Sequence, residues 1–502
     1  MTREAFILAR MLRFFDRHRT SDGGWTRRDW LTAGSLAGLA GALGAVIPGA
    51  SGSRLGARRA TAGEPIGSSS GLPGFGRAKS VIMVFASGGQ SQFETWDPKP
   101  DAPADVRGEF GSIATRIPGV RFCEHLPRTA EIADRLAVVR CMSHEDLDHG
   151  SAVYLALTGH YHTRRSSNPA PSPIDSPTFG AVLRRLRPNP KFICDAIHLN
   201  GPALVPTTPS PGQNGGLLGR ASEPMLIGDV RDAAGAIPGL APQPGLPPVR
   251  LGERLSLKET LDAYAQSLDK HPQAADFDRI YHDALKLLGS PQARAAFDLE
   301  AEPPAVRDRY GRHRSGQACL LARRLVEAGV PYVNVIWNHS NRGQDLAPDD
   351  TDLYGWDTHN DIFASLRERL LPRFDESFSA LIADLDSRGL LDTTLVICMG
   401  EFGRAPRVAL EPKFAGATPG RKHWPNVYSI ALAGAGVGRG VVVGASDRLG
   451  AEPAGDRFGP WDVGATIFHA LGIDPSGFFS DATGRMLPIT HGRPLLAAYR
   501  GR

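Results

Sequence analysis

The residues best suited to chemistry are acidic and histidine side chains that follow short apolar runs. Polar loops follow the runs 80–86 (SVIMVFA), 332–337 (YVNVIW) and 393–400 (TTLVICMG). Parallel strands end at one edge of a sheet, so side chains that follow them are expected to meet there. The residues at these positions are Ser91, Glu94 and Asp97 after the first run, Asp357, His359 and Asp361 after the second, Glu401 and Arg404 after the third, and His423 shortly afterwards.

Several carboxylates with only a few histidines suit a hard or borderline divalent ion, namely Zn²⁺, Mn²⁺, Mg²⁺ or Ca²⁺. Such an ion neutralises negative charge, polarises a phosphoryl, sulfuryl or carbonyl oxygen and lowers the pKa of bound water. The pattern therefore predicts a divalent metal site at one rim of the fold, and it does not select the ion.

Two of these residues have a structural alternative. Asp361 directly precedes a helical pattern that begins at Ile362, and we interpret it as the helix N-cap. Glu401 could pair with Arg404 or Arg407 instead of binding an ion. The predicted site therefore depends on the convergence of several loops.

Strands and amphipathic helices alternate along the chain. The apolar runs are rich in β-branched residues and are typical of strands buried on both faces. We predict a mostly parallel central sheet with helices on both faces, an α/β fold. Further strands are predicted at 137–140, 193–199, 427–434 and 441–447, and helices at 126–136, from 151, and at 176–186, 251–289, 306–329, 362–389 and 462–474, with a kink at Pro372.

Composition excludes several function classes. Residues 1–62 contain ten Arg and four acids, a charge of +6, whereas the whole chain of 502 residues carries +4. The remainder is therefore slightly acidic and carries no basic stripe, so no nucleic-acid partner is expected. The five cysteines have no CxxC spacing, which indicates buried free thiols rather than disulfides or a thiolate zinc site.

The N-terminal segment is predicted to be an export signal. The sequence TRRDWL (26–31) precedes an uncharged Ala/Gly/Leu run, an order similar to that of a twin-arginine signal, so the twin-arginine export machinery is an expected partner. We expect a signal peptide at 1–62, a linker at 63–78 and one domain at 79–502 with a Pro/Gly-rich insertion at about 200–250. The protein is then periplasmic or extracellular, and it contacts the membrane only through an uncleaved leader.

From about 79 to 475 the chain resembles the exported bacterial family called domain of unknown function 1501, itself similar to the alkaline phosphatase and sulfatase superfamily. The resemblance implies an alkaline-phosphatase-like core with long loop insertions. It is carried by the segments KSVIMVFASGGQSQFETWDPKP, DHGSAVYLALTGHY, YGRHRSGQACLLARRLVEAGVPYVNV, GWDTHND, LDTTLVICMGEFGRAP, GRKHWPN and DVGATIFHALGID.

The resemblance also implies a set of site residues. In the superfamily's order, Glu94 or Asp97 takes the first metal position, Asp357 and His359 follow, Glu401 comes next and His423 is last. His149 falls where the superfamily has its nucleophile, at a helix start, where it could act as nucleophile, acid/base or metal ligand. Ser91 and Ser151 are nearby hydroxyl candidates.

The sequence departs from this pattern at several positions, and within the family Glu94 replaces a usual Asp and Ala405 a usual Thr. Phe402 replaces the second member of an Asp-His pair, which implies that one metal position is weakened or lost. Lys422 replaces the Asp of the family's usual GRDHW, which places a cation beside His423.

Two functions follow from these observations. The first is an exported metal-dependent hydrolase of phosphate, sulfate or related esters, in which Arg404 neutralises an anionic substrate. The second is a catalytically reduced relative that binds an anionic extracellular polymer or a partner as a scaffold, supported by Phe402 and Lys422. The sequence GAGVGRG (434–440) resembles a dinucleotide loop, but a predicted strand follows it, so we interpret it as a turn.

Overall fold

The computed structural model describes residues 71–189, 195–205, 207–231, 295–338, 340, 355–481 and 483–500. All of them belong to one compact unit, Ile66–Arg502. The predicted signal peptide, half of the predicted linker, part of the predicted insertion and the predicted helix at 251–289 lie outside the described residues.

An eight-stranded sheet forms the centre of this unit, in the order β14-β4-β13-β10-β1-β9-β5-β8. Strand β13 is antiparallel to both of its neighbours, and all other pairs are parallel. The predicted mostly parallel sheet is therefore confirmed. Its strands are β1 (Ser80–Phe85), β4 (Leu136–Met142), β5 (Ala196–Leu199), β8 (Met225–Ile227), β9 (Tyr332–Ile336), β10 (Thr394–Met399), β13 (Tyr428–Ala433) and β14 (Val441–Val443).

The apolar runs form central strands because both of their faces are buried. In β1, Ile82 and Val84 belong to one hydrophobic core, and Val81, Met83 and Phe85 belong to the other. Side chains alternate across a strand, so a continuous apolar run supplies both cores at once.

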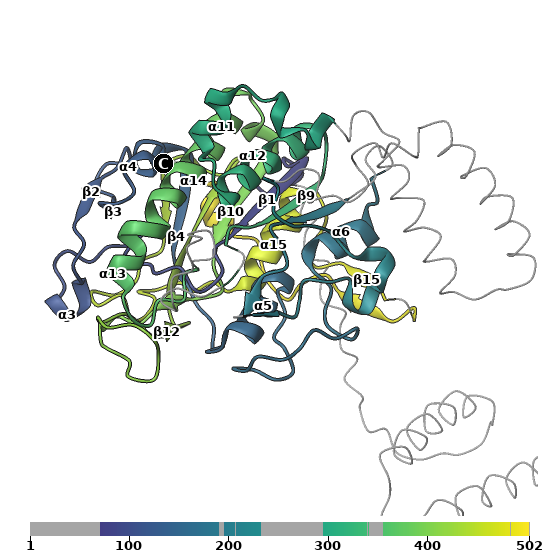
Figure 1. Ribbon diagram of the computed structural model, residues 1–502. Coiled ribbons are helices and arrows are strands. Elements are labelled where there is room, and N and C mark those ends of the chain that lie inside the picture. Colours follow the sequence, from purple (N-terminus) through teal and green to yellow (C-terminus); the bar gives the residue numbers. More distant parts are fainter. Residues whose placement is uncertain are drawn as a thin grey trace, which may run out of the picture. The chain divides into compact units, whose positions relative to one another are not determined.

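Helices cover both faces of the sheet, as predicted. Figure 1 shows α12 and α14 above the strands and α5, α6 and α15 below them. The first group contributes side chains to the core of Ile82 and Val84, and the second group to the core of Met83. The helices are α3 (Ala104–Arg107), α4 (Pro127–Glu131), α5 (His149–Thr158), α6 (Phe179–Leu186), α11 (Pro304–Tyr310), α12 (Arg314–Glu327), α13 (Ile362–Ser365), α14 (Leu371–Ser387) and α15 (Pro460–Ala470).

Two predicted helices are interrupted in the structure. The pattern 306–329 divides into α11 and α12 because Gly311 ends α11 with a φ of 84°, a conformation that glycine adopts without strain. The pattern 362–389 contains a π-helical turn, Leu366–Leu370, directly before α14. Pro372 is the second residue of α14, and a π-turn before a proline accommodates its missing N–H and its ring.

Short two-stranded ladders surround the central sheet. The Gly-rich segment 434–440 turns directly into β14 and precedes no helix, with positive φ at Gly434, Gly436 and Gly440. The small strands are β2 (Ser112–Ala114), β3 (Arg121–Cys123), β6 (Leu204–Val205), β7 (Thr208–Pro209), β11 (Gly403–Arg404), β12 (His423–Trp424), β15 (Phe478–Ser480) and β16 (Met486–Pro488).

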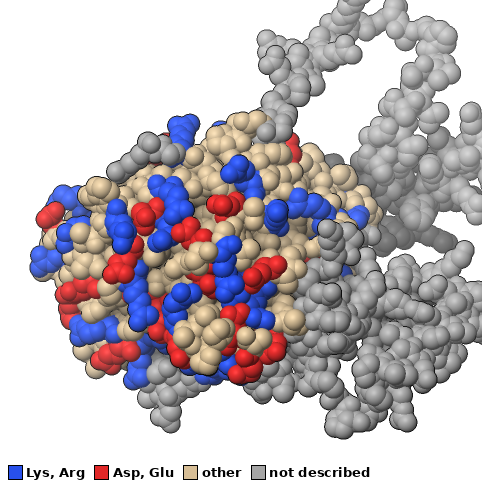
Figure 2. Space-filling view, turned by 90° about the horizontal axis from the view of Figure 1, so that it is seen from above, with Lys and Arg blue, Asp and Glu red and all other residues tan. Residues whose placement is uncertain are grey.

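Surface charge and hydropathy add two observations. Acidic and basic side chains are interspersed on the face seen in Figure 2, so the part of this face not covered by grey atoms presents no extended area of one charge. Within the described residues, no helix combines the length and the apolar character needed to cross a bilayer.

Four cysteines, Cys123, Cys141, Cys319 and Cys398, are buried and free, as predicted for them.

A buried histidine in β5 makes stability depend on pH. His198 is 1% exposed and neither ring nitrogen has a hydrogen-bond partner among the described residues. Burial lowers the pKa of His198 from 6.5 to about 4. The unfolded chain therefore binds a proton at His198 more readily than the folded chain does. This difference leaves the free energy of unfolding unchanged above pH 6.5 and lowers it as the pH falls from 6.5 towards 4.

We predict that His198→Leu makes the free energy of unfolding less dependent on pH between 6.5 and 4, by up to about 1.4 kcal/mol per pH unit. Urea unfolding at several pH values measures this slope. Phe478→Ala, a change at an exposed side chain that does not titrate, serves as the control and should keep the wild-type slope. Equal slopes for His198→Leu and the wild type would contradict the prediction.

Candidate metal centre

One carboxylate, that of Asp357, lies among three histidines and an arginine. Its Oδ1 lies 2.8 Å from Nη2 of Arg404, 3.1 Å from Nε2 of His359 and 3.2 Å from Nε2 of His423, and its Oδ2 lies 3.2 Å from Nε2 of His149. Burial raises the pKa of Asp357, but the attraction of His149 and Arg404 outweighs it and holds the pKa well below its usual range. Asp357 is therefore an ionised acceptor at the centre of the cluster.

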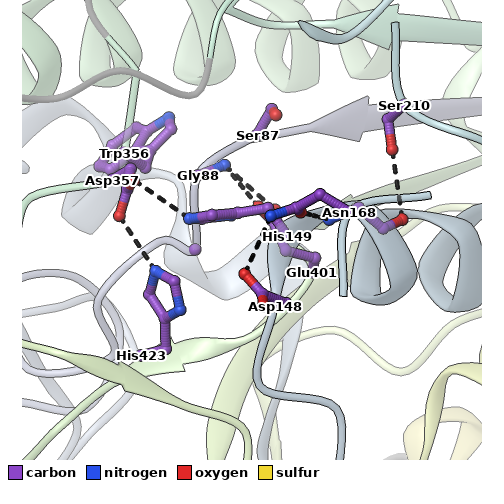
Figure 3. Close-up of polar contacts among 12 residues, drawn as sticks. Ser87, Gly88, Asp148, His149, Asn168, Ser210, Trp356, Asp357, Glu401 and His423 are labelled. Carbon is purple, nitrogen blue, oxygen red and sulfur yellow. Dashed lines mark hydrogen bonds and ion pairs between the residues drawn. The ribbon is translucent and has the colours of Figure 1, made fainter. Parts of the chain in front are cut away.

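His149 links the partly buried Asp357 to a fully buried carboxylate. It is the first residue of α5, and its Nδ1 lies 2.6 Å from Oε1 of Glu401 (Figure 3). Glu401 follows β10, is fully buried and accepts a hydrogen bond from the backbone N–H of Gly88 at 2.8 Å. Burial lowers the pKa of His149, but Asp357 and Glu401 raise it more, to about 9. Glu401 thus orients the imidazole so that Nε2 faces Asp357, and His149 has to release the proton at Nε2 before that atom can bind a metal ion.

His423 is held from its other side by the backbone. It lies in β12, which pairs with β11, and its Nδ1 lies 2.7 Å from the carbonyl oxygen of Leu147. A carbonyl only accepts, so Nδ1 carries the proton and Nε2 presents a lone pair towards Asp357. Burial and the charge of His149 lower the pKa of His423 to about 4. His423 is therefore neutral, as a metal ligand must be.

Aromatic rings surround the histidines. Nε2 of His359 is 2.9 Å from Nε2 of His423, and the His359 ring stacks on Phe414 with centroids 3.7 Å apart and planes 4° apart. Phe402 is buried, and its ring centroid lies 4.9 Å from that of His149 and 4.6 Å from that of His423. These rings reduce the access of water to the ring nitrogens.

This donor set fits a divalent metal ion. One ligand atom from each of His149, Asp357 and His423 lies within 4.8 Å of the others. Nε2 of His359, Nε2 of His423 and Oδ1 of Asp357 are 2.9 to 3.2 Å apart. This is slightly closer than the donors around tetrahedral Zn²⁺, which lie about 2.0–2.1 Å from the ion and about 3.4 Å from one another. In His149 and His423, Nδ1 is bound by a carboxylate and a carbonyl, which is the usual support of metal-binding histidines.

Arg404 connects two loops to this cluster through hydrogen bonds. Its guanidinium donates to the backbone carbonyls of Gly88, Gly89 and Arg421 and to Asp357. The side chain is fully buried. Most of its donors are therefore occupied by protein groups, and its charge is directed at Asp357.

Glu94, which was predicted to be a metal ligand, lies in a separate buried ion pair. Ser91, which was predicted to be a catalytic hydroxyl, is hydrogen-bonded to Glu94. Arg421 donates from Nη2 and Nε to Oε1 of Glu94 at 2.7 and 3.0 Å, and Ser91 donates its hydroxyl to Oε2. Arg421 and Glu94 are both almost completely buried. The structure thus gives Glu94 an arginine partner, a residue that the sequence pattern does not connect with it.

Asp97 is also placed with cations. Its carboxylate lies 3.0 Å from Nζ of Lys99 and 3.3 Å from Nη1 of Arg140, and Ser446 donates its hydroxyl to it. The structure therefore unites His149, Asp357, His359, Glu401, Arg404 and His423 among the predicted site residues, and it places Ser91, Glu94 and Asp97 in other contacts.

Three other predicted features have local partners. Asp361 stands at the N-cap position of α13 with a φ of 51°, but its side chain does not cap the helix and instead accepts from the backbone N–H groups of Ala417 and Thr418. Ser151 donates to Asp146 at 2.6 Å. Nζ of Lys422 lies 3.0 Å from Glu411 and its side chain is 62% exposed.

Several supporting groups have no signal in a single sequence. The N–H of Gly88 and the carbonyl of Leu147 are backbone atoms whose roles depend on tertiary structure. His144 bonds the backbone carbonyl of Glu401 through Nε2 at 2.6 Å. Of these groups, only His144 has a side chain that could have suggested a role, because it lies two residues after the end of β4.

Residues 78–498 match the family described as "Protein of unknown function (DUF1501)", and the chain therefore belongs to this family. No curated protein matches the sequence. Among solved structures, the chain is similar to the phosphonate monoester hydrolase SpPMH from Silicibacter pomeroyi, with 13% identity, a TM-score of 0.37 and coverage of 83% of this chain and 75% of that chain.

Two further structures show a likeness of similar extent. The lipoteichoic acid synthase LtaP from Listeria monocytogenes has 10% identity and a TM-score of 0.34, with 86% of this chain and 80% of that chain covered. The PsFucS1 sulfatase from Pseudoalteromonas sp. has 13% identity and a TM-score of 0.35, with 79% and 68% covered.

The placement of Glu94 leads to a prediction about stability. Glu94→Gln leaves the buried Arg421 without its counter-ion, so the free energy of unfolding should fall by about 3–5 kcal/mol. Glu145→Gln is the matched control, because its partner Arg165 is 52% exposed and Glu145 is 79% exposed. That variant should lose less than about 1 kcal/mol. A Glu94→Gln protein with wild-type stability but no affinity for divalent ions would show instead that Glu94 is a ligand.

Proposed function

We propose that this DUF1501 protein is a metal-dependent hydrolase of phosphate, sulfate or related esters. The observation that carries the proposal is the convergence of three imidazole Nε2 atoms on the carboxylate of Asp357, with both His149 and His423 fixed through Nδ1. His149, Asp357, His359 and His423 would hold the ion. The superfamily's ligand order, implied by the sequence resemblance, agrees with three of these four positions and assigns the helix-start position to His149.

The chain's own residues prepare the site for an anionic ester. A bound divalent ion would polarise an ester oxygen and lower the pKa of its bound water. Glu401 holds the proton at Nδ1 of His149, and the carbonyl of Leu147 holds the proton at Nδ1 of His423. Arg404 balances the charge of Asp357. Phe402 excludes water beside the rings of His149 and His423, which strengthens the electrostatic interactions of these two side chains. Arg404 therefore acts on the substrate through Asp357 in this proposal.

A second candidate is a catalytically reduced binding or scaffold module for an anionic extracellular polymer or partner. The specific observation in its favour is that both hydroxyl candidates are committed elsewhere, Ser91 to Glu94 and Ser151 to Asp146. A hydrolase with a covalent intermediate needs a free nucleophile. A hydrolase that uses metal-activated water does not, and the histidine cluster is better explained by the first candidate.

The export of the protein is part of the same proposal. The Arg27–Arg28 pair and the apolar run that follows support a twin-arginine signal and a periplasmic or extracellular location. We expect Arg27→Lys together with Arg28→Lys to retain the protein in the cytoplasm, measured by cell fractionation. Export of the double variant at the wild-type level would contradict this part.

Metal binding should distinguish the cluster from the other buried acids. The purified protein, stripped with chelator and titrated with Zn²⁺ or Mn²⁺ by calorimetry, should bind at least one ion per chain. His423→Ala and Asp357→Asn remove ligands and should abolish measurable binding, and Glu401→Gln should weaken it by about 10- to 100-fold because it removes the support of His149. Asp97→Asn is the control and should bind as the wild type does.

Turnover is the second arm of this experiment. A panel of 4-nitrophenyl phosphate, 4-nitrophenyl sulfate and phosphonate monoesters should reveal hydrolysis by the metal-loaded protein, and His423→Ala should lose it. A wild-type protein that binds no divalent ion would contradict the proposal. Metal binding with no turnover on any ester would favour the binding module instead.

A further inference from the structure

Two residues with exposed apolar side chains contact the candidate metal ligands, Phe414 through its ring and Leu147 through its backbone carbonyl. Phe414 is 42% exposed and stacks on the ring of His359, and Leu147 is 53% exposed while its own carbonyl fixes His423. The two histidines are adjacent, with Nε2 atoms 2.9 Å apart. Both apolar side chains therefore belong to residues in direct contact with the predicted ligand pair.

The loop that carries Phe414 is fixed by the same motif that supplies the ligands. Asn360, which follows His359, is fully buried, and its side-chain amide donates to the backbone carbonyls of Glu411, Phe414 and Ala415 and accepts from the N–H of Glu411. This use occupies both amide hydrogens and the amide oxygen.

Two further contacts close this loop. Asp361, whose φ is 51°, accepts from the N–H groups of Ala417 and Thr418 and from the hydroxyl of Thr418. Lys422 pairs with Glu411 at 3.0 Å. Phe414 is thus an exposed ring in a position determined by many hydrogen bonds, and its exposure is not the result of a loose loop.

We propose that Phe414, together with Leu147, is a specificity-determining wall that selects esters whose alcohol part carries a ring with a flat apolar face. This inference rests on the proposed function, because it requires an anionic ester at the ligand pair. An aryl or a sugar ring presents a flat face to the fixed phenyl ring and loses little freedom on contact, whereas a methyl or a short chain covers less of it. Aryl and glycosyl esters share this chemistry.

The test compares pairs of anions that share a phosphonate or phosphate group and differ in whether a ring or a methyl group is attached to it. Calorimetry of the Zn²⁺-loaded protein measures Kd for phenylphosphonate against methylphosphonate and for glucose 1-phosphate against methyl phosphate. In the wild type, at least one ring compound should bind about 2- to 12-fold more tightly than its methyl partner, the effect of one aromatic contact. The pair that shows the preference identifies an aryl or a glycosyl ester as the natural class.

Phe414→Ala should bring the Kd ratio of that pair towards one. Phe478→Ala is the matched control, the same change at a phenylalanine of β15 that is 57% exposed, and it should keep the wild-type ratio. A wild-type ratio near one for both pairs, or a preference that survives Phe414→Ala, would overturn the inference while leaving the proposed function standing. Loaded protein that binds none of the four anions would overturn both.

Discussion

The ionised carboxylate of Asp357 holds the other residues of the site in place. Only 16% of this side chain is exposed, and a carboxylate largely withdrawn from water requires cations or strong donors around it. The sequence supplies them from four separate segments, since His149 begins α5, His359 lies in the loop of Asp357, Arg404 follows β10 and His423 lies in β12. These four segments thus meet around this one negative charge.

The second layer of contacts makes the meeting point rigid. Arg404 joins the Gly88–Gly89 turn after β1 to Asp357, and Glu401 joins the N–H of Gly88 to His149. Buried networks of this kind specify one arrangement only when their members are satisfied. The ligand nitrogens are therefore positioned by hydrogen bonds within the protein, from Nδ1 of His149 to Glu401 and from Nδ1 of His423 to the carbonyl of Leu147.

Periodicity predicted most of the fold, and the polar loops predicted part of the site. The strands Ser80–Phe85 and Thr394–Met399 followed from continuous apolar runs, because both faces of each strand are buried. The convergence of Asp357, Glu401 and His423 followed from the rule that strand ends share an edge. Residue type alone could not show that Glu94 lies outside the histidine cluster, because its partner Arg421 is 327 residues away in the sequence and the ion pair exists only in the folded chain. Lys422 was expected to disturb His423, but its flexible side chain pairs with Glu411.

We propose that His149, Asp357, His359 and His423 form one metal site. Crystals of the full chain grown with Zn²⁺, with diffraction measured at wavelengths on both sides of the zinc absorption edge, would locate the ion by its anomalous signal. The anomalous peak is expected within about 2.0–2.2 Å of Nε2 of His423 and of an oxygen of Asp357, with Glu401 bound to His149 and not to the ion. A peak at Glu94 or Asp97, or no peak between the histidines at saturating Zn²⁺, would contradict it.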